Sequence, residues 1–353
     1  MSKIIRSPEA LIPGKRKDST YVFLAGPIQG VHDWQTEDIP DLGEGITLIN
    51  PRRAEHPDPT FDWNEQVRWE TAALRVSDYV LFWVPKEEEH IEGRDYAQTT
   101  KIELMENLVR GKNIVFGIDP EVHTRRYLIH KFEAYTNRKA HDNLEDCIKE
   151  LKEMIEEREK GDRTFFTSDT HFGSVRTLQL SKRPFLDDLE MDWTMIERWN
   201  KVVSPSARVI HLGDFGDYEA AKYLNGNITL MYGNYERKDH EGLEKKPIDW
   251  LKEHNIKVVD PTVSAMQVKG FEEDPDLKLV LGHEPLNVKK FLDTRDADQG
   301  SWCLFGHIHA RQRVKKFGVD VGVDGNNFTP MSLKDVKFYL EAIDKHYDEE
   351  VWS

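Results

Sequence analysis

The sequence predicts an α/β fold arranged as two domains, and three observations lead to this. In the first half, short apolar runs that end in Gly-Pro, Asn-Pro or Pro alternate with helical patterns, which is typical of a parallel sheet. In the second half, five apolar runs are each followed by a short polar cluster. A charged helical segment separates the halves, and a chain of 353 residues suits two domains.

The first half contains four expected strands and two expected helices. The helices are placed at about 62–76 and 100–110, between the later strands. The strands are Tyr21–Ala25, Ile46–Ile49, Tyr79–Val84 and Asn113–Phe116.

A long charged helix is expected from Asn143 to Lys160. Asn143 is a plausible N-cap and Gly161 a plausible stop. Its apolar stripe consists of Leu144, Ile148, Leu151 and Ile155. The domain boundary is therefore placed near Gly161, giving domains 1–160 and 161–353. Whether this helix closes the first domain or acts as a rigid spacer stays open at this stage.

The composition is that of a soluble globular protein. It contains 38% hydrophobic and 32% charged residues, with a formal net charge of -15. Because an acidic surface repels phosphate backbones, long nucleic acid is not expected as a partner. The distant Cys147 and Cys303 suit a reducing compartment. The N-terminus lacks a signal-peptide core and no apolar run reaches ~18 residues, so we expect a cytoplasmic protein without a membrane partner.

The polar clusters of the second half are expected to meet at one edge of a sheet. If the apolar runs are strands, every cluster sits at the carboxyl end of a strand, where ligands of open α/β sheets gather. Glycines in the clusters let the backbone turn sharply and approach an ion. The clusters are Asp169-Thr-His171, Gly213-Asp214, Gly233-Asn234, Gly282-His283 and Gly306-His307-Ile-His309.

Carboxylate, imidazole and amide ligands predict a site for two divalent metal ions. Such ligands suit manganese, iron, nickel or zinc. One aspartate can bridge two ions ~3.5–4 Å apart, as two-metal hydrolases require. Any one cluster is a weak signal, since a lone histidine after a strand is usually structural. The prediction rests on the presence of all five clusters in this order along the chain.

Together these motifs resemble the calcineurin-like metallophosphoesterase superfamily, whose pattern is D-x-H, G-D, G-N-H-[DE], H and G-H-x-H. The resemblance covers roughly Arg163 to Asp344. It implies an α/β sandwich domain that hydrolyses phosphate esters. By position, it assigns one metal to Asp169, His171, Asp214 and His309, and the other to Asp214, Asn234, His283 and His307. Asp214 would bridge the two ions.

One position departs from this pattern. Where the superfamily usually has a histidine that helps protonate the leaving group, this chain has Tyr235. Tyrosine, with an ordinary pKa of about 10, can donate a hydrogen bond but is a poorer acid. Either the substrate has a good leaving group or His240 reaches in. Arg176 and Arg183 are candidate phosphate contacts, and a surface salt bridge is the alternative for each.

Two glutamates are candidate catalytic residues of the first half. Glu103 is expected in the first turn of a helix, where the dipole would stabilise the anion as a nucleophile; alternatively, Thr100 and Glu103 form a capping box. Glu70 shares a helical face with Trp63, Val67 and Leu74. Desolvation there would raise its pKa and suit a general acid, whereas an ion pair with Arg68 or Arg75 is the alternative.

The first 140 or so residues resemble the nucleoside 2-deoxyribosyltransferase-like family, through YVFLAGPI at 21–28, NP at 50–51, WE at 69–70, SDYVLFWVP at 77–85 and TTKIELMENL at 99–108. The resemblance implies a flavodoxin-like (Rossmann-like) domain that cleaves N-glycosidic bonds. Glu103 matches the nucleophile, Glu70 the carboxylate that handles the base, and Gly26 the glycine beside the sugar or its 5′-phosphate. Phe23 stands where the family often has a sugar-contacting tyrosine. Some members borrow a residue from a neighbouring subunit, which would suit a homo-oligomer.

These features lead to a bifunctional enzyme as the main hypothesis. The first domain would cleave or transfer the base of a nucleoside or nucleotide, and the second would hydrolyse a phosphate ester of a related small molecule. In the alternative, the first domain only binds or senses a nucleotide, and the second is a phosphoesterase. A cyclic-nucleotide phosphodiesterase or nuclease is a third interpretation of the second domain.

Overall fold

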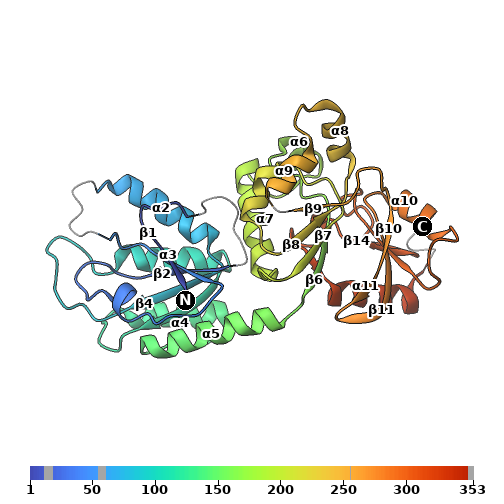
Figure 1. The fold of residues 1–353 in the computed structure, drawn as a ribbon. Helices are drawn as coiled ribbons and strands as arrows, with labels where there is room; N and C mark the ends of the chain where they lie inside the picture. The colour runs from blue at the N-terminus through green and yellow to red at the C-terminus, as the bar shows by residue number, and fades with distance from the viewer. Residues whose placement is uncertain (12–18, 55–60, 255, 349–353) are drawn as a thin grey trace. The chain divides into compact units, whose positions relative to one another are not determined.

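The computed structural model describes residues 1–11, 19–54, 61–254 and 256–348 (Figure 1). The chain divides into two compact units: the described residues up to Arg158 form the first, and those from Glu159 onward form the second. Among the described residues, no helix is long and apolar enough to cross a membrane.

The first unit is built on a parallel five-stranded sheet. Its strands lie in the order β1-β3-β2-β4-β5. Their bounds are β1 Lys3–Arg6, β2 Thr20–Ala25, β3 Ile46–Asn50, β4 Tyr79–Val84 and β5 Asn113–Ile118. β2 lies between β3 and β4, so the chain order reverses there; pockets of open α/β sheets form at the carboxyl ends of strands at such a point.

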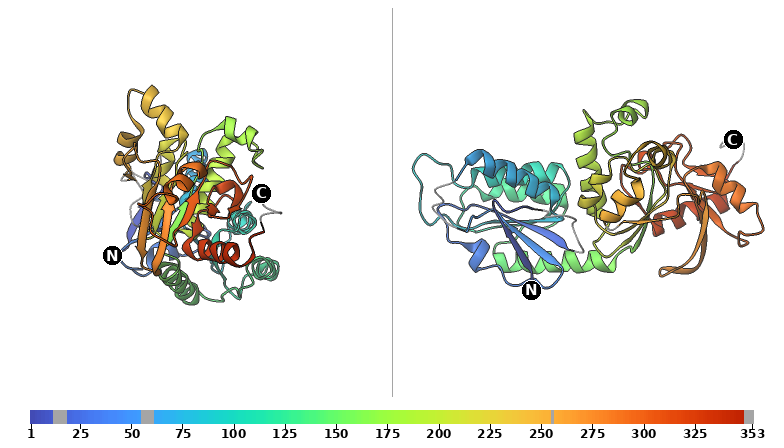
Figure 2. Two further views of the ribbon diagram at one scale, coloured as in Figure 1. Left: turned by 90° about the vertical axis from the view of Figure 1, so that its right-hand side faces the viewer. Right: turned by 45° about the horizontal axis from the view of Figure 1, so that its top comes forward.

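Helices cover both faces of this sheet (Figure 2, right). They are α1 Trp34–Glu37, α2 Trp63–Val76, α3 Gln98–Val109, α4 Arg125–Thr136 and α5 Leu144–Lys160. On one face, Cys147, Ile148 and Leu151 of α5 pack with β-strand residues such as Leu24 and Leu81. On the other, Phe132 of α4 meets Phe116 of β5 with ring centroids 5.5 Å apart. The apolar stripe of α5 therefore belongs to the core of the first unit.

The second unit contains two five-stranded sheets. One has the order β15-β6-β7-β8-β9 and the other β10-β11-β12-β14-β13. The strands are β6 Thr164–Thr167, β7 Arg208–His211, β8 Asn227–Leu230, β9 Lys257–Val258, β10 Met266–Phe271, β11 Asp274–Leu281, β12 Trp302–Phe305, β13 Val314–Lys315, β14 Gly318–Asp320 and β15 Met331–Ser332. β6, β7 and β8 are parallel, as are β11 and β12.

Side chains along each strand alternate between the two faces of its sheet, and this alternation produces the layers of the second unit. Phe166 and Ile210 of one sheet share a core with Leu281 and Leu304 of the other, so the two sheets face each other. The opposite face of the first sheet packs on α7, and that of the second on α10. The helices are α6 Val175–Leu180, α7 Asp188–Val202, α8 Asn234–Gly242, α9 Pro247–Glu253, α10 Pro285–Leu292 and α11 Leu333–His346.

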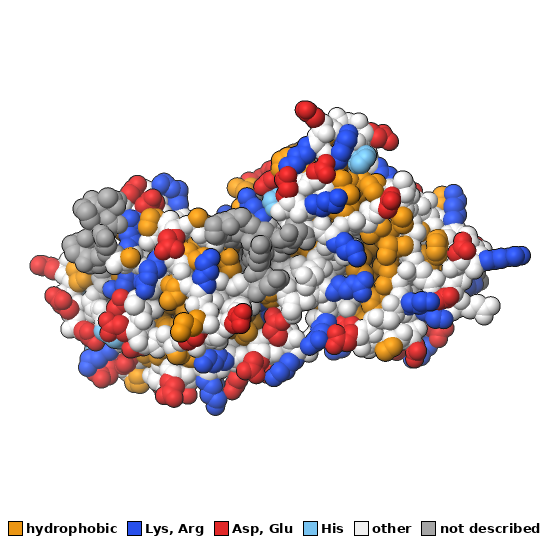
Figure 3. Space-filling view, in the orientation of Figure 1, with side chains coloured by type: hydrophobic (Ala, Val, Ile, Leu, Met, Phe, Trp, Pro, Cys, Tyr) orange, Lys and Arg blue, Asp and Glu red, His pale blue; other side chains and the backbone are white. Residues whose placement is uncertain are grey.

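Every strand expected from the sequence is present, with small changes of bounds. The strands that the sequence analysis missed are short or lie at sheet edges, such as β1, β9 and β13. Charged side chains of both signs are interspersed over the face of each unit drawn in Figure 3.

Candidate metal centre and N-terminal pocket

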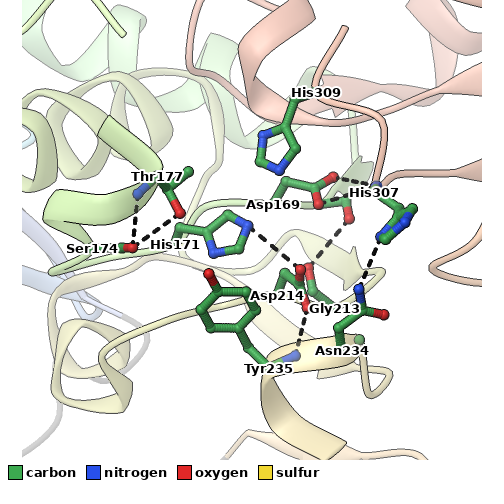
Figure 4. A network of polar contacts seen from close by, with 12 residues as sticks. Asp169, His171, Ser174, Thr177, Gly213, Asp214, Asn234, Tyr235, His307 and His309 are labelled. Atoms are coloured by element: carbon green, nitrogen blue, oxygen red, sulfur yellow. Dashed lines mark hydrogen bonds and ion pairs between the residues drawn. The ribbon is translucent and has the colours of Figure 1, made fainter. Parts of the chain in front are cut away.

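The predicted metal ligands of the second unit come together at the carboxyl ends of five strands. Asp169 and His171 follow β6, Asp214 follows β7, and Asn234 follows β8. His283 follows β11, and His307 and His309 follow β12. Figure 4 shows the two aspartates in the middle of the site, with His171, His307 and His309 around them.

Two groups of side chains in this cluster can each hold a metal ion. Within each group, the ligand atoms lie within 4.8 Å of one another. Asp169, His171 and His309 form one group, and Asp214, His283 and His307 form the other. The sequence predicted the same two pairs of histidines, His171 with His309 and His283 with His307, and the same place for Asp169 in the first group, but it also gave Asp214 to both sets and Asn234 to the second.

Asp214 lies between the two groups. Its Oδ2 is 3.5 Å from Nε2 of His171 and 3.4 Å from Nε2 of His283. One carboxylate oxygen thus faces a histidine from each group, which is the position that a bridging ligand needs. The side-chain amide nitrogen of Asn234 lies 3.1 Å from Nδ1 of His307, so Asn234 adjoins the second group.

The backbone of the ligand residues is strained. Asp169, His171, Asp214, His307 and His309 have φ of 59°, 50°, 57°, 72° and 48°. Positive φ is uncommon outside glycine and persists only where the surroundings enforce it, often at functional sites. The chain also approaches two of these carboxylates closely, because a Cβ on Gly306 would lie 2.3 Å from Oδ2 of Asp169, and one on Gly233 2.4 Å from Oδ1 of Asp214.

The donor atoms of this centre fit metal ions. His171 is 1% exposed, and neither of its ring nitrogens has a hydrogen-bond partner among the described residues. Leaving a buried polar atom unpaired is costly. Burial lowers the pKa of His171 to about 4, which keeps its imidazole in the neutral form that binds metals.

A backbone carbonyl and a carboxylate outside the cluster orient two of the candidate ligand rings. Nδ1 of His283 lies 2.9 Å from the Leu212 carbonyl, and Nδ1 of His309 lies 2.9 Å from Oδ2 of Asp324. Each contact directs the other ring nitrogen, Nε2, toward the site. The sequence analysis gave Asp324 no role.

Glu236 was also missed as a site residue. Its side chain is fully buried, and it accepts hydrogen bonds from the backbone N–H groups of Asp214, Phe215 and Gly233 at 2.8, 2.6 and 2.8 Å. It ties the loop after β7 to the start of α8. The signal in the sequence was its place in the Gly-Asn-Tyr-Glu segment, at the [DE] position of the superfamily pattern.

The structure places Arg176 and Tyr235 beside the candidate metal centre. The Arg176 guanidinium donates to the Tyr235 hydroxyl at 3.1 Å, and the Tyr235 ring lies edge-on to His171 with centroids 4.6 Å apart. His240, which the sequence suggested as a replacement acid, contacts the Tyr232 hydroxyl, with its Nδ1 3.3 Å from that oxygen.

Arg183 differs from both interpretations made from the sequence. Its side chain is fully buried, which excludes a surface salt bridge and leaves it no access to a phosphate. It forms a bidentate ion pair with Asp324, at 2.8 and 2.9 Å. Its remaining donors bind the carbonyl oxygens of Thr170 and Asp169 at 2.7 and 2.6 Å. Arg183 therefore supports the loop that carries Asp169 and His171.

The first unit contains a pocket of about 1100 Å³ at the carboxyl ends of β2, β3 and β4. Loop residues after all three strands line it, together with one face of α2 and the start of α3. Glu70 and Glu103 both line this pocket.

Burial sets the pKa values of these two carboxyl groups. It raises the pKa of Glu103 to about 8, with further contributions from Glu70 and Glu106. Burial also raises the pKa of Glu70, which accepts a hydrogen bond from Nε2 of Gln66 at 3.0 Å. An ion pair with an arginine would lower this pKa, so desolvation is the interpretation that the structure favours.

The expectation for the helix of Glu103 was wrong in its details. α3 begins at Gln98, and its N-cap Ala97 makes no side-chain capping bond, so Thr100 and Glu103 form no capping box. Glu103 consequently lies beyond the first turn, where the helix dipole contributes little. The raised pKa of Glu103 is opposite in direction to the expected stabilisation of the anion.

Gly26 lines the pocket, but packing also requires a glycine there. A Cβ at this position would lie 2.3 Å from the Trp83 carbonyl oxygen and 2.6 Å from the Trp34 ring. Phe23 lines the same pocket and is 1% exposed.

Comparison with known proteins gives information on part of the chain. An uncharacterized protein of Methanocaldococcus jannaschii is 24% identical in an alignment of 188 residues that covers 48% of this chain and 87% of that protein. A crystal structure of a protein of unknown function from Aquifex aeolicus aligns with a TM-score of 0.39 and 19% identity, over 50% of this chain and 98% of that one. Residues 19–121 match the family described as nucleoside 2-deoxyribosyltransferase like, so this region of the first unit is similar to that family.

Proposed function

We propose that the chain is a bifunctional nucleotide-processing enzyme. The first unit cleaves or transfers the N-glycosidic bond of a nucleoside or nucleotide, and the second hydrolyses a phosphate ester with two divalent metal ions. In this proposal the first unit is flavodoxin-like and the second calcineurin-like.

The observation that carries the phosphoesterase proposal is the position of Asp214 between two histidine-containing groups. Asp169, His171, Asp214 and His309 would hold one ion, and Asp214, Asn234, His283 and His307 the other. When bound, manganese, iron, nickel or zinc would neutralise phosphate charge and supply a water of lowered pKa. Arg176 and Tyr235 bind the phosphate ester, and Tyr235 donates a hydrogen bond to one of its oxygens.

The glycosidic proposal is supported by the two carboxyl groups that share the pocket. Two interacting acids with raised pKa values can hold one proton between them near neutral pH. With that proton on Glu70, ionised Glu103 attacks the anomeric carbon, the C–N bond breaks, and Glu70 protonates the departing base. Water or a second base then releases the sugar from Glu103.

Two observations favour the alternative that the first unit only binds or senses a nucleotide. A pKa of about 8 leaves Glu103 mainly protonated at neutral pH, and a protonated carboxyl is a poor nucleophile. The buried Phe23 also lacks the hydroxyl that the family's tyrosine offers to the sugar.

A metabolite screen tests both activities. The purified chain is incubated with manganese and with nucleosides, nucleotides or dinucleotides, and free base and free phosphate are followed together. We expect base release to persist in Asp214→Asn and to disappear in Glu103→Gln, with the reverse for phosphate release. Base release that Glu103→Gln leaves unchanged contradicts the glycosidic mechanism, and intact ligand after long incubation supports the sensor alternative.

Comparing substrates defines the phosphoesterase further. Hydrolysis of a phosphomonoester and a cyclic or linear diester is measured with manganese and with a chelator. A preference for diesters or activated leaving groups is expected from the weak acidity of Tyr235.

A further inference from the structure

Helix α2, labelled in Figure 1, buries most of its apolar side chains but leaves Trp63 and Val67 exposed beside the pocket. Trp69, Ala73, Leu74 and Val76 are buried, and the Trp69 indole N–H donates to the Glu9 carbonyl at 2.8 Å. Trp63, at the start of the same helix, is 67% exposed. It lines the pocket of the first unit. A large apolar ring held open toward a cavity is a feature of binding sites.

We infer that Trp63 is the stacking surface for the base of the nucleoside or nucleotide bound in this pocket. The inference rests on the proposed glycosidic function, because that function places a nucleobase beside Glu70. Neither the family match nor the sequence motifs assign a role to Trp63.

Helical spacing supports this placement. Trp63, Val67 and Glu70 are separated by four and three residues, so they lie along one face, and all three line the pocket. Seven residues separate the Cα atoms of Trp63 and Glu70 by ~10.5 Å along the helix axis. A sugar whose anomeric carbon faces Glu70 and Glu103 thus leaves its base room to extend over Val67 toward the indole ring.

Two polar side chains beside this face, Gln66 and Arg53, already contact other groups of the protein. Gln66 donates to the Pro51 carbonyl at 2.9 Å and to Glu70, and it accepts from the Ser7 hydroxyl at 2.6 Å. Arg53 pairs with Glu65 at 2.6 Å. Recognition here therefore uses the face of the base more than its edges. Stacking tolerates different bases and increases with ring size, so purines bind more tightly than pyrimidines.

Binding measurements on the full chain test the inference. All variants carry Glu103→Gln so that the ligand stays intact, and the probes are inosine, uridine and ribose 5-phosphate. Trp63→Ala is expected to weaken inosine binding at least about tenfold, and Trp63→Phe by less than about threefold. Ribose 5-phosphate, which has no base, should bind equally well to all variants.

Tyr127→Ala provides a matched control. Tyr127 is 63% exposed on α4 of the same unit and does not line the pocket, so its removal should change no affinity. Because Trp63 is similarly exposed, Trp63→Ala should keep the melting temperature of the parent, which separates a lost contact from a lost fold.

The outcomes distinguish this inference from the proposed function. Weaker inosine binding in Trp63→Ala, without base release by the native chain, leaves the stacking role standing and overturns the chemistry. If the native chain releases base, an unchanged KM when Trp63→Ala is made in the native chain, with Glu103 retained, overturns the stacking role alone. An equal loss of affinity for inosine and for ribose 5-phosphate in Trp63→Ala also overturns the stacking role. The stacking role is overturned too if the Glu103→Gln parent binds no nucleoside at millimolar concentration.

Discussion

The guanidinium of Arg176 donates a hydrogen bond to the phenolic oxygen of Tyr235 across 3.1 Å. Because a guanidinium has only donors, Tyr235 must accept in this bond, and its own O–H proton remains available for another acceptor. Tyr235 is also fixed at its backbone, where its N–H donates to Oδ1 of Asp214 at 2.9 Å. The pair thus presents a hydroxyl donor beside the candidate metal centre.

Tyr235→Phe should lower kcat/KM for phosphate-ester hydrolysis by roughly tenfold to a hundredfold, because it removes one hydrogen bond to a charged group. Tyr235→His should keep or raise the activity, since histidine is a better acid at neutral pH. Steady-state kinetics on one ester measure both effects, with Tyr127→Phe in the other unit as control. Equal activity of Tyr235→Phe and the native chain would exclude this role.

Arg183→Met should destabilise the second unit by about 3–5 kcal/mol, because it leaves Asp324 buried without its partner. Arg183→Lys should also destabilise, since one ammonium cannot replace the four contacts of the guanidinium. Urea unfolding measures the change, and exposed Arg176→Met is the matched control. A loss below about 1 kcal/mol would show that the buried pair contributes little.

Removal of metal ions should lower the melting temperature of the native chain, and added manganese should restore it. A ligand that binds only the folded state at a hundred times its Kd stabilises by about 2.7 kcal/mol. Asp214→Asn keeps the shape of the side chain but removes the charge between the two groups, so the manganese effect should shrink. Calorimetric scans with chelator and with manganese test this; a native chain that does not respond to manganese contradicts the metal assignment.

The stability of the first unit should fall as the pH rises from about 4.5 toward 8, because the pKa of Glu103 is raised to about 8. Between these values the unfolded chain has lost the Glu103 proton while the folded chain retains it. The free energy of unfolding therefore decreases with pH in this window and levels off above it.

The Glu103→Gln variant, whose side chain cannot ionise, should lack the pH dependence that Glu103 gives to the free energy of unfolding. It should be more stable than the native chain at pH 8, by on the order of 1–3 kcal/mol. Urea unfolding of both proteins at pH 5 and pH 8 provides the comparison. An equal pH dependence in the two proteins would show that Glu103 ionises normally in the folded state.

The sequence by itself determined the strands that precede the candidate site residues, the order of the polar clusters and the identity of the metal-ligand candidates. These follow from local patterns, because an apolar run that ends in glycine and a polar residue already specifies a strand and the turn after it. The alternation of Phe165 and Phe166, which fill different cores, is likewise a property of any strand. The sequence also identified Glu70 and Glu103, and both line one pocket.

Only the tertiary structure decided what surrounds each of these residues. Burial, and not position in a helix, sets the pKa of Glu103, and burial depends on segments distant in the chain. Arg183 was expected at a phosphate but pairs with Asp324, which lies 141 residues away in the sequence. Trp63 and Trp69 are two tryptophans of the same helix. The packing of α2 leaves Trp63 exposed to the pocket and buries Trp69. Local sequence cannot predict these differences, because they arise from contacts between elements far apart in the chain.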